Sequence, residues 1–219
     1  MAGIVQSQRR KRLSRALYAL SLALLLFSLT SLAWAVWPVA TDARTFTIPA
    51  GPLPGAPSGT SFASQVDYTL QVSWPRWIRA GEAGQIVVSL SEAEASVDET
   101  QARETQIVLL SPSVTGLPLD PAGQTQINLG PGQELTQAWS VDGLAAGDHA
   151  GKLVAAFGFF DDALGQLVPV PVAVVDLSIQ VVTLWGLARG LVLWLGVVGL
   201  ALWGALFILG RVVEGGGRI

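Results

Sequence analysis

Residues 168–210, VPVPVAVVDLSIQVVTLWGLARGLVLWLGVVGLALWGALFILG, join a valine-rich run to a long apolar segment with almost no polar break. The valine-rich half is typical of a β-strand, because β-branched side chains favour the pleated conformation. Residues 191–209 are 19 uncharged residues, which as a helix would span about 28 Å, close to the ~30 Å hydrocarbon core of a bilayer. The stretch therefore predicts a strand that leads into a transmembrane helix, which we place at residues 184–210.

A second apolar segment lies near the N-terminus. Residues 16–37 are 22 uncharged residues, about 33 Å long as a helix. Five basic residues precede it: Arg9, Arg10, Lys11, Arg12 and Arg15. Basic residues beside a membrane span favour the cytoplasmic side. We therefore expect residues 1–15 and 211–219 to be cytoplasmic tails and the region between the two helices to be extracytoplasmic.

The first apolar segment is also compatible with a cleaved signal peptide. It follows a basic region, and Ala33-Trp34-Ala35 matches a small-residue cleavage site. Its apolar region is, however, longer than the usual ~7–15 residues of a signal peptide. Trp34 and Trp37 also suit an aromatic anchor at a membrane surface. We therefore expect an uncleaved anchor, with cleavage as the alternative.

Charge is distributed unevenly along the 219 residues. The chain has a formal net charge of −3, yet residues 38–183 hold 15 acidic and 5 basic residues. A region this acidic does not suit binding to nucleic acid, which is itself negatively charged. We expect membrane lipid and other integral membrane subunits as partners. Arginine outnumbers lysine 11 to 2 and alanine and glycine are abundant, which is typical of bacteria with GC-rich genomes. The expected location is the bacterial cytoplasmic (inner) membrane.

The central region alternates between apolar and polar residues. Val66, Tyr68, Leu70, Val72 and Trp74 alternate with polar residues, as in a strand with one buried face. Six further short apolar runs, separated by Gly/Pro/Asp turns, follow up to residue 179. The pattern predicts an all-β immunoglobulin-like sandwich over residues 65–180, after a Pro/Gly-rich linker at residues 38–64. Its expected core includes Trp74, Ile86, Val88, Leu90 and Trp139.

Two short patterns carry a resemblance to bacterial immunoglobulin-like domains. Ala80-Gly81-Glu82 forms a turn ahead of an Ile/Val strand. Trp139-x-Val141, followed by Ala146-Gly147-Asp148-His149 and an apolar strand, resembles the late strands of such domains. The resemblance covers about 115 residues and is generic, since the Cys…Trp…Cys hallmark is absent.

Catalytic and metal-binding patterns were sought among the polar residues. His149 is the sole histidine, and it could pair with Asp148, Asp161 or Asp162, but no serine lies in a G-x-S-x-G turn. Without cysteine and with one histidine, the chain alone cannot build a histidine zinc site or a His/Met haem site. Asp161-Asp162 and the acidic run Glu92–Glu104 are conceivable calcium ligands, although neither matches an EF-hand loop. We expect a protein without enzymatic activity or a cofactor of its own.

Small residues in the two apolar segments are candidate packing positions. In the first segment they recur every seven residues, which places them on one face of a left-handed helix pair: Ser14, Ser21, Ser28 and Ala35. In the second, Gly186 and Gly190, and Ala201 and Ala205, form small-xxx-small pairs. Arg189 lies between the two glycines, at the end away from the basic tail, and we expect it to have a partner. Small residues are common in membrane helices and serine can bond its own helix, so packing against other subunits is one of two interpretations.

The combined pattern favours a non-catalytic accessory or scaffolding subunit of a larger membrane complex, with a respiratory or photosynthetic electron-transport assembly as a plausible host. A ligand-binding receptor or sensor, or an assembly factor, is the alternative. The expected cytoplasmic tails are too short for a signalling domain, which disfavours a sensor.

Overall fold

A computed structural model of the chain describes residues 2–53, 62–93, 105–161 and 165–215. The chain divides into two compact units. The helical unit comprises Met1–Pro38 and Thr183–Ile219, and the β domain comprises Val39–Val182.

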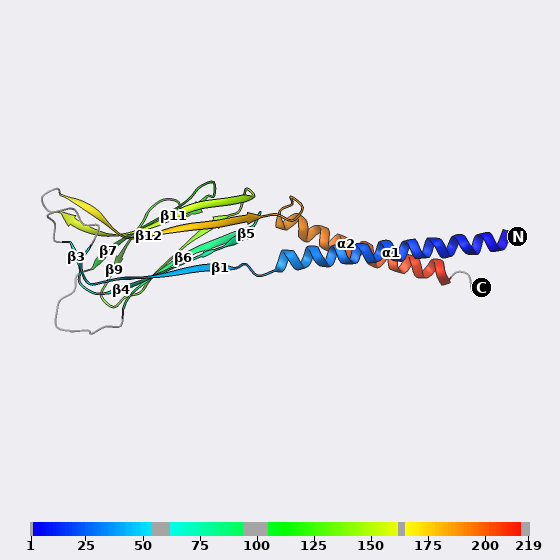
Figure 1. The fold of residues 1–219 in the computed structure, drawn as a ribbon, viewed down its shortest axis with the longest axis horizontal. Helices are drawn as coiled ribbons and strands as arrows, with labels where there is room; N and C mark the ends of the chain where they lie inside the picture. Colours follow the sequence, from blue (N-terminus) through cyan, green and yellow to red (C-terminus); the bar gives the residue numbers. More distant parts are fainter. Residues whose placement is uncertain (1, 54–61, 94–104, 162–164, 216–219) are drawn as a thin grey trace. The chain divides into compact units, whose positions relative to one another are not determined.

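The helical unit contains α1, Ala2–Val36, and α2, Arg189–Gly215 (Figure 1). Within them, Arg12–Val36 and Arg189–Val213 are long and apolar enough to cross a membrane. Pro38 disfavours the helical conformation at the residue before it, which accounts for the end of α1 at Val36. The helix extends further toward the N-terminus than the apolar segment, so the basic residues 9–15 continue it.

Helix α2 begins five residues later than the sequence predicted, at Arg189 rather than at residue 184. Leu184 and Leu187 exchange two backbone hydrogen bonds, of 3.3 and 3.0 Å. Between them Trp185 and Gly186 have positive φ angles of 53° and 74°. Positive φ at both central residues is the geometry of a tight type I′ turn and is incompatible with a right-handed helix.

The β domain contains two five-stranded sheets and a two-stranded ribbon. The first sheet has the order β1 (Thr41–Ile48), β4 (Tyr68–Pro75), β6 (Ala83–Glu92), β10 (Leu135–Asp142) and β8 (Leu119–Asp120). The second has the order β5 (Trp77–Arg79), β12 (Gln166–Val182), β11 (Gly147–Asp161), β7 (Gln106–Val114) and β9 (Thr125–Leu129). The ribbon pairs β2 (Gly51–Pro52) with β3 (Ala63–Ser64). Neighbouring strands are antiparallel except β5 and β12.

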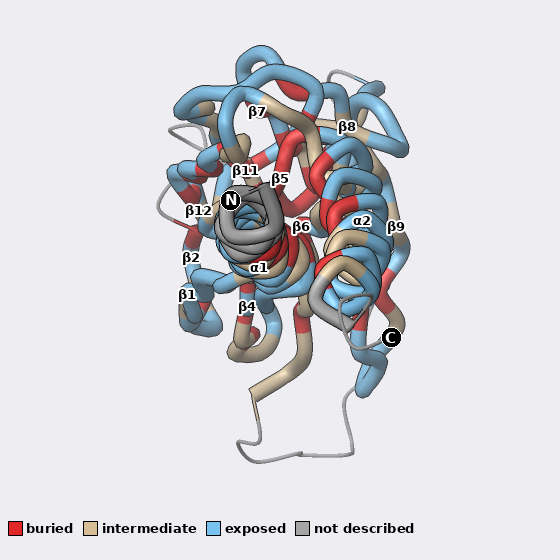
Figure 2. The backbone as a smooth tube through the Cα atoms, turned by 90° about the vertical axis from the view of Figure 1, so that its right-hand side faces the viewer, coloured by how far each residue is buried: buried red, intermediate tan, exposed pale blue. Residues whose placement is uncertain are grey.

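The inward faces of the two sheets form one core, and its buried positions are red in Figure 2. Tyr68 of β4 contacts Phe157 of β11 edge to face, with ring centroids 5.3 Å apart, so side chains of both sheets meet there. The alternation in β4 has the expected consequence, because its apolar residues are buried and its polar ones are not. The five residues predicted for the core are buried: Trp74, Ile86, Val88, Leu90 and Trp139.

Strand β1 corrects the predicted linker at residues 38–64. It pairs with β4 over its whole length, from Thr41↔Pro75 to Ile48↔Tyr68, and so belongs to the domain. Its side chains are exposed up to Thr45, so the apolar alternation in the sequence is confined to Phe46 and Ile48 at its end. Strands β11 and β12, of 15 and 17 residues, are longer than the short strands that the sequence predicted. Most of the acidic run 91–106 and of the proline stretch 49–59 lies outside the described residues.

Candidate functional site

One face of α1 is lined by small residues and is buried within the helical unit. Ser14, Ser21, Ser28 and Ala35 are 8%, 3%, 0% and 0% exposed. Residues seven apart stay on nearly the same face of a helix, drifting by about 20° per repeat. The four residues selected from the sequence therefore form a single stripe, and Ser31 extends it.

Helix α2 meets this stripe with glycines. A Cβ atom added at Gly199 would lie 2.2 Å from Ser28 Oγ, and one at Gly196 would lie 2.8 Å from Leu32 Cγ. At Gly210 it would lie 3.2 Å from the ring of Tyr18. A missing Cβ lets the two backbones approach closely, which is how helices associate where apolar surroundings supply no hydrophobic driving force.

The serine hydroxyls are satisfied within α1. Ser28 donates to the Leu24 carbonyl at 2.7 Å, Ser21 to that of Tyr18 at 2.9 Å, and Ser31 to that of Phe27 at 2.8 Å. Such bonds to the preceding turn let serine lie on an apolar face without an unsatisfied hydroxyl. The serines thus contribute their small size to the interface.

The four small residues singled out in the second segment lie elsewhere. Gly186 is in the turn before α2, so Gly186 and Gly190 do not form a helical small-xxx-small pair; added Cβ atoms at both would meet open space. Ala201 and Ala205 are exposed, on a face of α2 other than the one that packs on α1. A role for these alanines in binding another subunit stays a prediction.

The residues of α2 that do pack on α1 were not identified from the sequence. They follow a heptad repeat rather than a spacing of four, with the two series Val192, Gly199, Leu206 and Gly196, Trp203, Gly210 buried or half-buried. This seven-residue spacing can be read in the sequence. Because half of the positions carry large side chains, it does not stand out as a repeat of small residues.

Arg189 has a partner within the helical unit. Its Nε donates to the Ala35 carbonyl oxygen at 3.1 Å, near the C-terminus of α1. The last carbonyls of a helix have no partner in the helix itself and carry partial negative charge. Arg189 therefore caps α1.

The turn before α2 also packs on α1. The ring of Trp185 stacks on Phe27 with centroids 4.8 Å apart and planes 8° apart. A bulky residue at positive φ costs about 1–2 kcal/mol. The stack, worth about 0.5–1.5 kcal/mol, offsets much of that cost.

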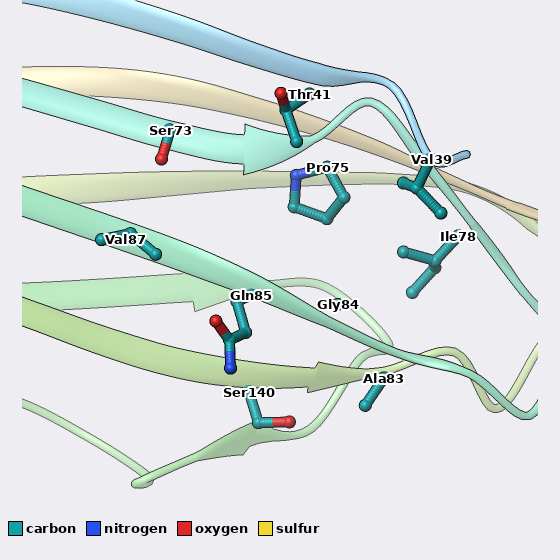
Figure 3. Close-up of a pocket in the computed structure, with 10 residues that line it drawn as sticks. All are labelled: Val39, Thr41, Ser73, Pro75, Ile78, Ala83, Gly84, Gln85, Val87 and Ser140. Atoms are coloured by element: carbon teal, nitrogen blue, oxygen red, sulfur yellow. The ribbon is translucent and has the colours of Figure 1, made fainter.

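The β domain has a groove of ≈ 410 Å³ on the sheet that contains β1, β4, β6 and β10 (Figure 3). Ser73 pairs with Val87, and Ser140 with Gln85, so these four residues share the face opposite the buried Trp74, Ile86 and Trp139. Gly84 permits the depth, since a Cβ there would lie 2.8 Å from the Pro75 ring. The lining residues are Val39, Thr41, Ser73, Pro75, Ile78, Ala83, Gly84, Gln85, Val87 and Ser140.

The lining of the groove is uncharged and offers hydroxyl and amide groups beside apolar surface. Such groups can hydrogen-bond a neutral ligand or an exposed peptide, and they are not acids or bases near neutral pH. A buried ion pair lies next to it in the chain: Arg79 Nη1 is 2.8 Å from Glu82 Oε2, and the Arg79 guanidinium is 4.9 Å from the Trp77 ring centroid. This pair ties together the turn between β5 and β6.

His149 lies near the start of β11 and bridges two loops. Its Nδ1 is 3.0 Å from the Thr115 carbonyl oxygen and its Nε2 is 3.0 Å from that of Ala145. Asp162 and nearly all of the Glu92–Glu104 run lie outside the described residues. In the part of the chain that the structure describes, no group of three histidine or acidic side chains could hold a metal ion.

The sequence was also compared with known proteins. No protein-family model matches the chain. No curated protein matches it at significant similarity.

Proposed function

We propose that this chain is a non-catalytic accessory or scaffolding subunit of a larger membrane complex in a bacterial cytoplasmic membrane. Both helices would cross the membrane with the termini in the cytoplasm. The β domain, as an immunoglobulin-like sandwich, would stand outside and present the groove. A respiratory or photosynthetic electron-transport assembly is one candidate host.

The observation that carries this proposal is that each helix buries one face against the other helix and leaves large apolar side chains exposed on the rest of its surface. Each helix packs on the other through one face that contains small residues, and large apolar side chains are exposed elsewhere, including Trp194 at 70%, Leu202 at 51% and Ile208 at 65%. So large an exposed apolar surface marks contact with membrane or with other protein. Ala201 and Ala205 interrupt it with two small residues one helical turn apart, which suits close approach by another helix.

The charge distribution supports the orientation. Residues 1–15 and 211–219 contain seven basic residues and one acidic residue, whereas residues 39–182 contain five basic and 15 acidic residues. Basic residues concentrate on the cytoplasmic side of membrane proteins. Two sheets around a shared core, antiparallel apart from the β5–β12 pair, support the immunoglobulin-like assignment.

The subunit proposal is tested by purifying the full chain from native membranes in mild detergent. We expect it to emerge with other integral membrane proteins, and cofactor absorption to belong to those partners. Ala201→Leu with Ala205→Leu should release them, because the added side chains fill the space between helices. The matched control, Ala201→Ser with Ala205→Ser, should retain them. A wild-type chain that emerges alone and monomeric would refute the proposal.

The orientation is tested with single cysteines, since the chain has none of its own. Leu144→Cys, at an exposed loop position of the β domain, should react with a membrane-impermeant maleimide on intact spheroplasts. Ser7→Cys should react only after permeabilisation. The reverse pattern would place the β domain in the cytoplasm.

The groove favours one alternative function, a ligand-binding receptor or an assembly factor. In that case a neutral ligand or client peptide should raise the thermal midpoint of the full chain. Val87→Trp should abolish the shift by filling the groove while the membrane partners are retained. If Val87→Trp loses both the ligand and the membrane partners, the ligand and the partners bind the same surface.

A further inference from the structure

One end of the helical unit carries an aromatic cluster built from both helices. Tyr18 of α1 meets Phe207 of α2 edge to face, with centroids 5.9 Å apart. Trp203 lies against Phe207 at the same centroid distance, with planes 29° apart. The Arg211 guanidinium carbon lies 5.4 Å from the Phe207 ring centroid, within the range of a cation–π contact. The cluster therefore holds the Arg211 cation beside the aromatic rings.

Cations from the two helices come to the same level at this cluster. Gly210 packs against the Tyr18 ring, and Arg211 is the next residue of α2. Arg15 precedes Tyr18 by three residues, about 4.5 Å along α1 and on the same side of the helix. Arg12, Arg15 and Arg211 are exposed. Arg15 thus lies near Tyr18, and Arg211 lies near Phe207.

The charge around this cluster is unbalanced. The first 15 residues include five basic ones and no acidic one, and Glu214 is the sole carboxylate side chain in the sequence of the helical unit. At the opposite end, Arg189 is already bonded to the Ala35 carbonyl. The end with the aromatic cluster therefore offers more cationic side chains to an anion than the end with Arg189.

We propose that Arg15 and Arg211, backed by Tyr18, Trp203 and Phe207, form a binding site for the phosphate of an anionic phospholipid. Guanidinium groups donate paired hydrogen bonds to phosphate oxygens. Aromatic rings lie favourably at the level of lipid headgroups, and basic pockets between membrane helices bind anionic headgroups. The inference rests on the proposed function only in requiring that the helices cross a membrane.

The test is native mass spectrometry of the full chain in mild detergent, titrated separately with phosphatidylglycerol and phosphatidylcholine. We expect at least about tenfold preferential retention of phosphatidylglycerol, which corresponds to about 1.4 kcal/mol. Arg15→Gln with Arg211→Gln should abolish this preference. Arg189→Gln is the matched control, since it removes one cation at the other end and should leave the preference unchanged. Arg15→Lys with Arg211→Lys should restore part of it, which distinguishes lost charge from lost folding.

Three outcomes would overturn the inference: equal retention of both lipids, an equal loss in the Arg189→Gln control, or displacement of the lipid by millimolar inorganic phosphate, which would indicate a small-anion site. Alkaline carbonate extraction separates this failure from that of the proposed function. If carbonate releases the wild-type chain, the membrane-subunit proposal fails. If the chain stays in the membrane but shows no lipid preference, only the lipid site fails.

Discussion

The helical unit and the β domain bury different kinds of residue. The face that α1 presents to α2 is rich in serine and alanine, and glycines of α2 lie where the two helices approach most closely. The β domain buries large apolar side chains, and Trp139, Phe157 and Leu70 are each 0% exposed. The two regions also differ in charge, with basic residues predominating in the first and acidic residues in the second.

The proposed membrane location of the helices would account for this difference. In water, folding is driven by removing apolar area from solvent, so the side chains that bury most area fill the core. Between helices in a lipid environment that driving force is absent, and close contact of backbones takes its place. The substitutions below test this contrast, beginning with the largest expected effect.

Replacing Trp139 by alanine should cost about 3–5 kcal/mol of unfolding free energy, because the ring is fully buried and its removal leaves a cavity. Urea unfolding of the full chain in mild detergent, followed by the β circular dichroism signal, measures this. Leu144→Ala, at a 72% exposed position, is the control and should change stability by less than about 0.5 kcal/mol. A loss below about 1 kcal/mol for Trp139→Ala would mean that the β domain does not depend on its large side chains.

Enlarging Gly199 should destabilise the helix pair by about 1–3 kcal/mol, because the new side chain overlaps Ser28. The variant is Gly199→Leu, assessed by titration with a denaturing detergent and helical circular dichroism. Gly204→Leu is the matched control, since an added Cβ at Gly204 meets nothing within 4 Å. If both variants behave alike, the small-residue face does not hold the pair together.

The smallest effect is expected at Trp185, where backbone strain and ring stacking oppose each other. Trp185→Ala keeps a side chain at positive φ and loses the stack on Phe27, whereas Trp185→Gly loses the stack but relieves the strain. We expect the glycine variant to be more stable than the alanine variant by up to about 1 kcal/mol. The same detergent titration compares them, and the reverse order would show that the turn is not strained.

Glycine is used differently in the two regions. In the β domain, the described residues with positive φ are glycines, most of them in turns, such as Gly81 and Gly116, whereas the helical unit places Trp185 in this conformation. Within the helices, Gly196, Gly199 and Gly210 serve close packing instead of turning. The same residue type thus has a conformational role in one region and a packing role in the other.

Periodicity in the sequence determined much of the architecture. The long uncharged runs identified both helices, because a bilayer-length apolar segment has few other uses. Strict alternation identified β4 and its buried residues, because strand side chains point alternately to the two faces. The seven-residue spacing of Ser14, Ser21, Ser28 and Ala35 identified the small-residue face of α1, because that spacing repeats every two helical turns.

Only the tertiary structure decided features that depend on contacts between distant segments. Strand β1 forms over its whole length because it pairs with the edge of β4, and the exposed side chains of its first five residues carry no periodic signal. The start of α2 was missed because Trp185 has no local preference for positive φ and is held by Phe27, far away in the chain. The partner of Arg189 is a carbonyl 154 positions earlier. Sequence patterns report what each residue prefers by itself, whereas these features depend on which residues from elsewhere in the chain lie beside it.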